Sequence, residues 1–185
     1  MLSINEIKSG LTVLLDRQIY AVLGYQHVKP GKGAAFVRIK LRNLKDGRVL
    51  EKTFKGDEKI EEVFIEERRL QYLYRSDRIY YFMDQRSFEQ VSISKDVLGE
   101  NSKFLKDALE ITAYFFNEKI LYIELPNFIE VKITHTEPGL KGDTARAAMK
   151  LATIETGVSI QVPLFIEVGD VIKVDTRSGK YIERA

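Results

Sequence analysis

The sequence predicts an all-β protein built from small barrels, and three observations support this class. Apolar and polar residues alternate over short segments, as in residues 36–42, which is the period-two pattern of a half-buried strand. Clusters of Gly, Pro, Asn and Asp separate these segments and mark turns. Apolar residues at helical spacing occur chiefly in residues 95–109. Many short strands joined by turns are typical of barrels and sandwiches, so we expect little helix.

Residues 1–63 contain the strand pattern of one small barrel. A loop rich in Pro and Gly separates two of its strands. A second hairpin turns at Asp46-Gly47, a dipeptide that favours a two-residue type I′ turn. Residues 55–62 are mostly charged, and we interpret them as a linker or a solvated face. The expected strands of this segment are residues 11–15, 18–23, 36–42 and 49–54.

Residues 64–126 and 127–185 each contain a further set of strands. In the middle segment, the helical pattern separates the third from the fourth of five expected strands, which is the order of an oligonucleotide/oligosaccharide-binding (OB) barrel. In the last segment, a polar loop at 135–150 interrupts the strands, and loops of that length are often functional. The expected strands are residues 70–74, 79–83, 88–93 and one on each side of 117–119 in the middle segment, then 128–134, 151–156, 158–165, 171–175 and 180–182.

The loop at residues 27–35 is the first candidate for a functional element. Pro30 fixes a φ that suits a turn, and Gly31 and Gly33 allow the backbone unusual angles and close approaches. Lys32 therefore stands between two residues that have no side chain, at the tip of a narrow hairpin. A solvated turn lysine is the alternative interpretation.

The strand after this loop presents a row of basic side chains. Because side chains alternate along a strand, Arg38, Lys40 and Arg42 share one face and three apolar residues share the other. Lys29 and Lys32 extend the row toward the tip. The N-terminal third also holds the excess of positive charge in a chain whose formal net charge is only +2. Such a row favours phosphates with little sequence preference, and an ordinary exposed charged strand is the alternative.

The sequence offers little for catalysis or metal binding. The chain has no cysteine and two histidines, His27 and His135, which stand in no ligand-like spacing. The residues around Lys32 lack the Ser/Thr and the helix of a phosphate loop, and no nucleophile elbow occurs. We therefore expect no catalytic residue, no metal and no enzymatic activity. No signal peptide or membrane span is apparent, so we expect a cytoplasmic protein without membrane contact.

A basic hairpin near the C-terminus is a further candidate RNA contact. Arginine and tyrosine can bind phosphate and stack on a base, which points to Arg177, Tyr181 and Arg184. A polar turn with Tyr181 packed inward is the alternative.

Several motifs, taken in their order and spacing, resemble those of bacterial elongation factor P over essentially the whole chain. The most specific is Val-Lys-Pro-Gly-Lys-Gly at residues 28–33, which the basic strand follows. The remaining motifs are residues 36–38, 40–42, 51–54, 72–74, 82–84, 125–127, 136–144, 162–165, 169–177 and Tyr181.

The resemblance implies three β-barrel domains in an L shape: an SH3/KOW-like domain at 1–63 and OB barrels at 64–126 and 127–185. It implies binding to the 70S ribosome between the P and E sites, beside the P-site peptidyl-tRNA, and relief of stalling at consecutive prolines. We expect a monomer. The implied tRNA contacts are Lys29, Pro30, Gly31, Lys32, Gly33, Arg38, Lys40 and Arg42, and the implied residues on the mRNA and small-subunit side are Gly142, Asp143, Thr144 and Arg146.

The resemblance also implies that a lysine-modifying enzyme extends Lys32 after translation, with a β-lysyl or a 5-aminopentanol group. The residues that flank the tip look more like the Gram-positive branch, which favours the aminopentanol type. Residues 145–151 depart from the family pattern, because Ala and Met replace glycines and Leu151 replaces a proline, so we expect a stiffer loop there. Two alternatives stay open: a paralogue of elongation factor P with other client sequences, and a generic RNA-binding protein with OB barrels.

Overall fold

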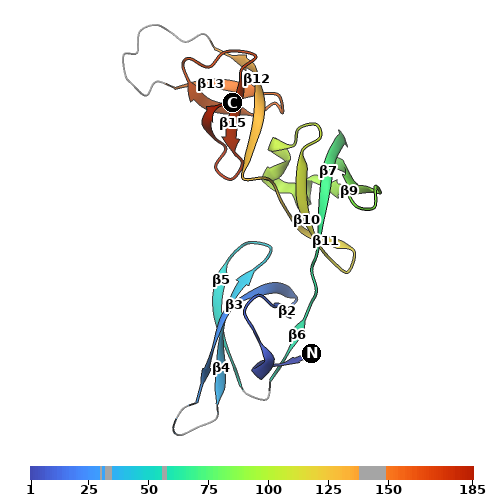
Figure 1. The fold of residues 1–185 in the computed structure, drawn as a ribbon, viewed down its shortest axis with the longest axis vertical. Coiled ribbons are helices and arrows are strands. Elements are labelled where there is room, and N and C mark those ends of the chain that lie inside the picture. Colours follow the sequence, from blue (N-terminus) through green and yellow to red (C-terminus); the bar gives the residue numbers. More distant parts are fainter. Residues whose placement is uncertain (30, 32–34, 56–57, 138–148) are drawn as a thin grey trace. The chain divides into compact units, whose positions relative to one another are not determined.

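The computed structural model describes residues 1–29, 31, 35–55, 58–137 and 149–185. The strands of this part of the chain form three sheets, and each sheet takes its strands from one continuous stretch of sequence (Figure 1). The helices between them are short. The expected all-β class with barrel-like sheets is therefore confirmed.

The first sheet contains six strands in the order β1-β6-β2-β3-β4-β5. Its middle strands form because three apolar residues alternate with three basic ones along β4, so one face can be buried while the other stays in water. A short 3-10 helix, η1 (Ile4–Glu6), lies between β1 and β2 and is capped by the Ser3 side chain. The strands are β1 (Leu2–Ser3), β2 (Thr12–Leu15), β3 (Gln18–Val28), β4 (Phe36–Asn43), β5 (Val49–Lys55) and β6 (Lys59–Glu62).

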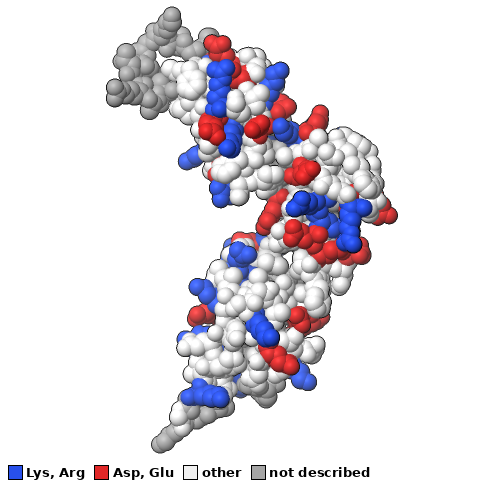
Figure 2. Space-filling model, viewed as in Figure 1, with Lys and Arg blue, Asp and Glu red and all other residues white. Residues whose placement is uncertain are grey.

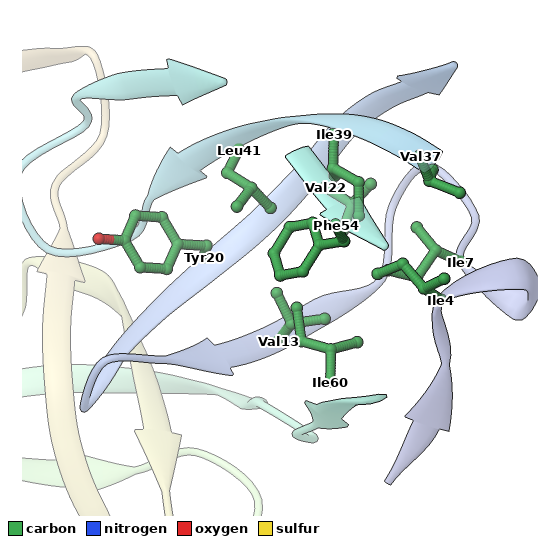
Figure 3. Close-up of a cluster of buried hydrophobic side chains, with 10 residues drawn as sticks. All are labelled: Ile4, Ile7, Val13, Tyr20, Val22, Val37, Ile39, Leu41, Phe54 and Ile60. Carbon is green, nitrogen blue, oxygen red and sulfur yellow. The ribbon is translucent and has the colours of Figure 1, made fainter. Parts of the chain in front are cut away.

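The inner faces of these strands enclose an apolar core. Val37, Ile39 and Leu41 project into it from β4, and none of them is more than 2% exposed. Figure 3 shows side chains from β2, β3, β4, β5 and β6 gathered around Phe54, with Ile4 and Ile7 at one end. Each such side chain contributes roughly 1.5–3 kcal/mol of transfer free energy on burial. The core thereby fixes the orientation of the basic residues on the other face of β4.

One expectation for this sheet holds only in part, and another is wrong. The charged segment 55–62 was expected to be a linker or a solvated face; Lys59 and Glu61 are exposed, but the segment is not merely a linker, because β6 within it pairs with both β1 and β2. Its one large apolar residue, Ile60, is 3% exposed and belongs to the core, so a single buried position was enough to make a strand. The turn between β4 and β5 is not a two-residue type I′ turn, because Gly47 has a positive φ and Asp46 does not. The Asn43 side chain instead accepts two backbone N–H bonds from the turn.

The second sheet has the order β11-β10-β7-β8-β9. Two short helices, α1 (Lys95–Leu98) and the 3-10 helix η2 (Gly99–Phe104), lie between its third and fourth strands in sequence. This is the strand order of an OB barrel, as predicted, although the helical segment is shorter than the pattern over 95–109 suggests. The strands are β7 (Glu66–Ser76), β8 (Ile79–Asp84), β9 (Gln90–Ser94), β10 (Glu110–Phe116) and β11 (Lys119–Glu124).

The third sheet has the order β14-β13-β12-β15-β16, with β12 paired to both β13 and β15. Alternation along β12 and β15 buries Val131, Ile133, Ile172 and Val174 completely. Most of the polar loop between β12 and β13 lies outside the described residues. The strands are β12 (Phe128–Thr136), β13 (Met149–Ile154), β14 (Ser159–Pro163), β15 (Val171–Asp175) and β16 (Lys180–Arg184).

By internal contacts, the chain divides into two compact units. One comprises residues 1–67 with 114–122, and the other comprises 68–113 with 123–185. The three domain ranges expected from the sequence and the L-shaped arrangement stay predictions. Of the helices in the described ranges, none combines the length and the hydropathy that a membrane crossing requires.

Candidate nucleic-acid interface

The hairpin of β3 and β4 carries those predicted tRNA contacts that the structure describes. The two strands are paired along the whole of β4, and the last pair before the tip is Val28 with Phe36. The core described above anchors the other end of the hairpin. Pro30, Lys32 and Gly33 follow in the tip and lie outside the described residues.

Arg38, Lys40 and Arg42 form the predicted basic row along β4, and the structure brings them together on one face. All three residues are exposed, and within the described ranges their side chains form no hydrogen bond or ion pair. Glu51 of β5 is opposite Lys40 in the register, but no ion pair joins the two side chains. Since no carboxylate of the described ranges forms an ion pair with these three cations, they are available to an external anion.

The other face of the same hairpin is aromatic, and sequence reasoning missed it. Tyr25 and His27 pair with Ile39 and Val37, so they share the side of the sheet that faces the core. Their rings meet edge to face, with centroids 5.4 Å apart. A β-bulge between Val22 and Gly24 determines that these two side chains, and not Gln26, lie on this side of the sheet. The spacing of two residues between the rings was the available signal, but the bulge cannot be read from the sequence.

Two tip residues are described, and both are exposed. Lys29 follows β3 directly and has no side-chain partner within the described ranges. Gly31 lies in a bend, its φ is outside the left-handed region, and a Cβ there would meet nothing within 4 Å. Within the described ranges, neither backbone strain nor crowding therefore requires glycine at residue 31.

The C-terminal arginines predicted as RNA contacts are engaged within the chain. Arg177 donates to both carboxylate oxygens of Asp175, at 3.2 Å from Nε and 2.8 Å from Nη2. This pairing, together with backbone N–H bonds from Arg177 and Ser178, lowers the pKa of Asp175 to about 2. Arg184 pairs with Asp170 at 2.9 Å. Tyr181 is half-buried on β16, between the two alternatives weighed from the sequence.

An exposed ring lies beside these charges. Phe128 is 44% exposed at the start of β12, and the Nζ of Lys173 and the guanidinium of Arg177 lie 5.6 and 6.0 Å from its centroid. Lys173 also donates to Glu183, which raises the pKa of the lysine. Each of the two cations is thus paired with a carboxylate, so this cluster is close to neutral and differs from the row on β4.

The residues expected on the mRNA side, Gly142, Asp143, Thr144 and Arg146, lie outside the described residues. In the described ranges, no cluster of three or more His, Asp or Glu side chains is arranged to hold a metal ion. Basic side chains are scattered over the whole visible face rather than confined to one part (Figure 2). The basic row on β4 is therefore distinguished by the placement of three exposed cations on one face of a single strand and not by charge density alone.

Three family models match successive parts of the chain. They are the elongation factor P KOW-like domain at residues 3–60, the elongation factor P OB domain at 65–123, and the elongation factor P C-terminal domain at 129–184. The chain belongs to the elongation factor P family. Members of this family are translation elongation factors and not enzymes.

Full-length relatives agree with the family models. An elongation factor P from Moorella thermoacetica is 51% identical over 185 residues, which is all of both chains. One from Natranaerobius thermophilus is 50% identical over 184 residues, covering 100% of this chain and 98% of that protein. A solved translation initiation factor eif-5a family protein from Naegleria fowleri matches 67% of this chain and 96% of its own, with a TM-score of 0.55 and 14% identity. That likeness shows a shared fold.

Proposed function

We propose that this elongation factor P family member works in the bacterial cytoplasm on the 70S ribosome. It binds between the P and E sites, contacts the P-site peptidyl-tRNA and relieves stalling at consecutive prolines. The observation that carries the proposal is the row of exposed cations on β4, without partners in the described ranges, on the hairpin that leads to Lys32. A row of cations of this kind binds the phosphates of RNA, and such binding does not depend on the base sequence.

The hairpin can assist the reaction without chemistry of its own. A proline ring restricts the geometries that a prolyl donor or acceptor can present. A factor that holds the acceptor end of the tRNA in a reactive arrangement lowers the entropic part of the barrier. Arg38, Lys40 and Arg42 hold RNA phosphates, and the core beneath β4 keeps those side chains in place. The open surroundings of Gly31 agree with RNA passing close to the backbone near the tip.

Lys32 is the positioning residue of this proposal. A lysine at the tip accepts a β-lysyl or a 5-aminopentanol extension from a lysine-modifying enzyme, and either would lengthen the reach of the hairpin. Intact mass of the protein from its native host, with peptide mapping around residue 32, distinguishes these groups from an unmodified lysine. The loop with Gly142, Asp143, Thr144 and Arg146 is proposed to lie toward the mRNA and the small subunit.

The decisive test substitutes the tip lysine. Lys32→Ala removes the positioning group, so we expect the variant to lose rescue of a message with consecutive prolines, measured as full-length product in reconstituted translation. A message without proline runs should be translated equally well with both proteins. The thermal midpoint of Lys32→Ala should equal that of the unsubstituted protein.

Lys45 provides a matched control for Lys32. Lys45 is exposed in the turn between β4 and β5, at the end of β4 away from the tip. Lys45→Ala removes the same charge and should rescue normally. If Lys32→Ala also rescued normally, the proposed role of the tip would be wrong.

A further inference from the structure

Three successive rows on the outer face of the β7–β8–β9 sheet carry no charge, while the exposed Glu67 and Arg69 lie beyond them on β7 in the same alternation. Two rows cross the three strands in register: Gln71, Met83 and Gln90 form one, and Tyr74, Tyr81 and Ser92 form the next. A third row, nearest the β7–β8 turn, has Ile79 between two serines. All these positions alternate with the buried face of the barrel, where Tyr72, Tyr80 and Phe82 lie. A neutral face of this size is unusual in a chain with 30% charged residues.

A bulge creates the aromatic centre of this face. The register of β7 shifts between Tyr72 and Tyr74, which leaves Leu73 unpaired. Without the shift, strict alternation would turn Tyr74 toward the core, the side on which Tyr72 lies. With the shift, Tyr74 lies opposite Tyr81 on the outer face. The extra residue therefore moves one ring from the core to the surface.

The two rings form a platform that is open to solvent. Tyr74 and Tyr81 stack with centroids 4.7 Å apart and planes at 22°. Tyr74 is 49% exposed, and the neighbouring Leu73 and Ile79 are each 36% exposed. Part of the apolar surface of these two rings is in contact with water. A flat apolar partner that stacked on the rings would bury that surface.

Two arginines near the β7–β8 turn have contacts away from these rows. Arg75 pairs with Tyr80 in the register, so its side chain is on the side of the sheet that faces the core. Its guanidinium contacts the Tyr80 hydroxyl, and this contact raises the pKa of Arg75. Arg78, in the β7–β8 turn, donates to Asp96 at 2.8 Å. At the far row, the Gln71 amide donates to the Ala108 carbonyl at 3.5 Å. The three rows thus offer aromatic stacking and neutral hydrogen-bonding groups but no cation, and Arg69 lies beyond Gln71 at their edge.

We propose that this face binds unpaired RNA bases. OB barrels bind oligonucleotides across the outer side of their second and third strands, and β8 and β9 are those strands here. Tyrosine rings accept bases by stacking, and Ser and Gln side chains bond to base edges. A neutral face complements the uncharged base rather than the phosphate. This site differs in chemistry from the basic row on β4 and does not depend on the role of Lys32.

The test measures binding of the full-length protein to short labelled oligonucleotides without ribosomes. The probes are a single-stranded oligouridine, a single-stranded oligoadenosine and an RNA duplex of equal length, titrated over a range of salt. We expect the single strands to bind more tightly than the duplex. Tyr81→Ala should weaken single-strand binding roughly ten-fold or more, because a base–aromatic stack is lost. The slope of log affinity against log salt should not change, since no phosphate contact is removed.

Three further variants keep the result interpretable if Tyr81→Ala is unstable. Tyr81→Phe retains the ring and should bind as the unsubstituted protein does. Ser92→Glu, at an exposed position in the same row, adds a charge that repels RNA and should abolish binding. Phe64→Ala is the matched control, because Phe64 is an 82% exposed ring outside the sheets and its loss should have no effect.

Equal binding of single strands by the unsubstituted protein, Tyr81→Ala and Ser92→Glu would overturn the proposal and leave a protein surface as the occupant of the face. Tighter binding of the duplex than of the single strands would also overturn it. Self-association at high concentration that is lost in Tyr81→Ala would instead assign the face to a second copy of the chain.

Discussion

The β3–β4 hairpin and the β7–β8 hairpin have similar backbones, but their outer faces differ in chemistry. Each has a one-residue bulge in its first strand, after Val22 in one and after Tyr72 in the other. Each buries apolar residues on its inner face, in line with strand alternation. On the outer face, however, β4 presents three basic residues while β8 presents Ile79, Tyr81 and Met83.

This contrast indicates that the outward-facing residues of a small barrel determine which part of a nucleic acid it can bind. The inner positions are constrained by the core and look alike in both sheets. The outer positions cost little stability to change, since surface substitutions usually stay within about 0.5 kcal/mol. Cations select phosphates, whereas neutral rings select bases.

The largest effects are expected on the inner faces. Ile39→Ala on β4 and Phe82→Ala on β8 remove fully buried side chains, so we expect losses of about 2–5 and 3–5 kcal/mol in the free energy of unfolding. Urea unfolding of the full chain measures both. Arg38→Ala, on the outer face of β4, should change the unfolding free energy by less than about 0.5 kcal/mol. A comparable loss from Arg38→Ala would contradict the division into inner and outer roles.

The next effect concerns binding rather than stability. Replacing Arg38, Lys40 and Arg42 together by alanine should weaken binding to 70S ribosomes that carry peptidyl-tRNA. The slope of log affinity against log salt should fall in magnitude by about 2 to 3, since three phosphate contacts are lost. Filter binding at several salt concentrations measures the slope. An unchanged slope would mean that these three cations do not contact phosphate.

A smaller effect is expected where a cation is already paired. The Asp175 carboxylate has a folded-state pKa of about 2, below its ordinary value of 3.8, because Arg177 donates to it. It therefore stabilises the folded state above about pH 4, and this contribution is lost as the pH falls toward 2. Asp175→Asn should be less stable than the parent at pH 7 and equally stable near pH 2. Thermal unfolding at both pH values measures this, and an equal deficit at both would refute the assignment.

The smallest effect on stability is expected at the tip. Gly31→Ala adds a methyl group where no atom of the described chain lies within 4 Å, at a φ that alanine tolerates. Its unfolding free energy should change by less than about 0.5 kcal/mol. Rescue of consecutive prolines should nevertheless decrease, because the methyl group obstructs close approach to the tip. Normal rescue would show that nothing contacts the backbone at residue 31.

Much of the fold could be predicted because alternation is a local signal. The burial pattern of β4 follows directly from its sequence, and the OB order follows from the position of one helical segment. The strand β6 could not be predicted, since a single buried residue, Ile60, among charged ones produces no period. The turn at Asp46 was missed because its geometry depends on the Asn43 side chain, which bonds to the turn N–H groups.

The candidate site was predictable in part for the same reason. The row on β4 was found from alternation, and its lack of partners in the described ranges appears only in three dimensions. Tyr25, His27 and Tyr74 were missed because a bulge in each strand resets the alternation. Arg177 and Arg184 were proposed as RNA contacts because their carboxylate partners, Asp175 and Asp170, could not be assigned without the fold.

The two bulges have an evolutionary consequence. A deletion of the codon for Leu23 or Leu73 would remove the unpaired residue and leave every following side chain of that strand on its present face. Tyr25 and His27 would stay on the side that faces the core, and Tyr74 would stay on the outer face. Each bulge therefore allows its strand to lose one residue by an in-frame deletion, while the partner strands and the hydrophobic interior keep their sequences.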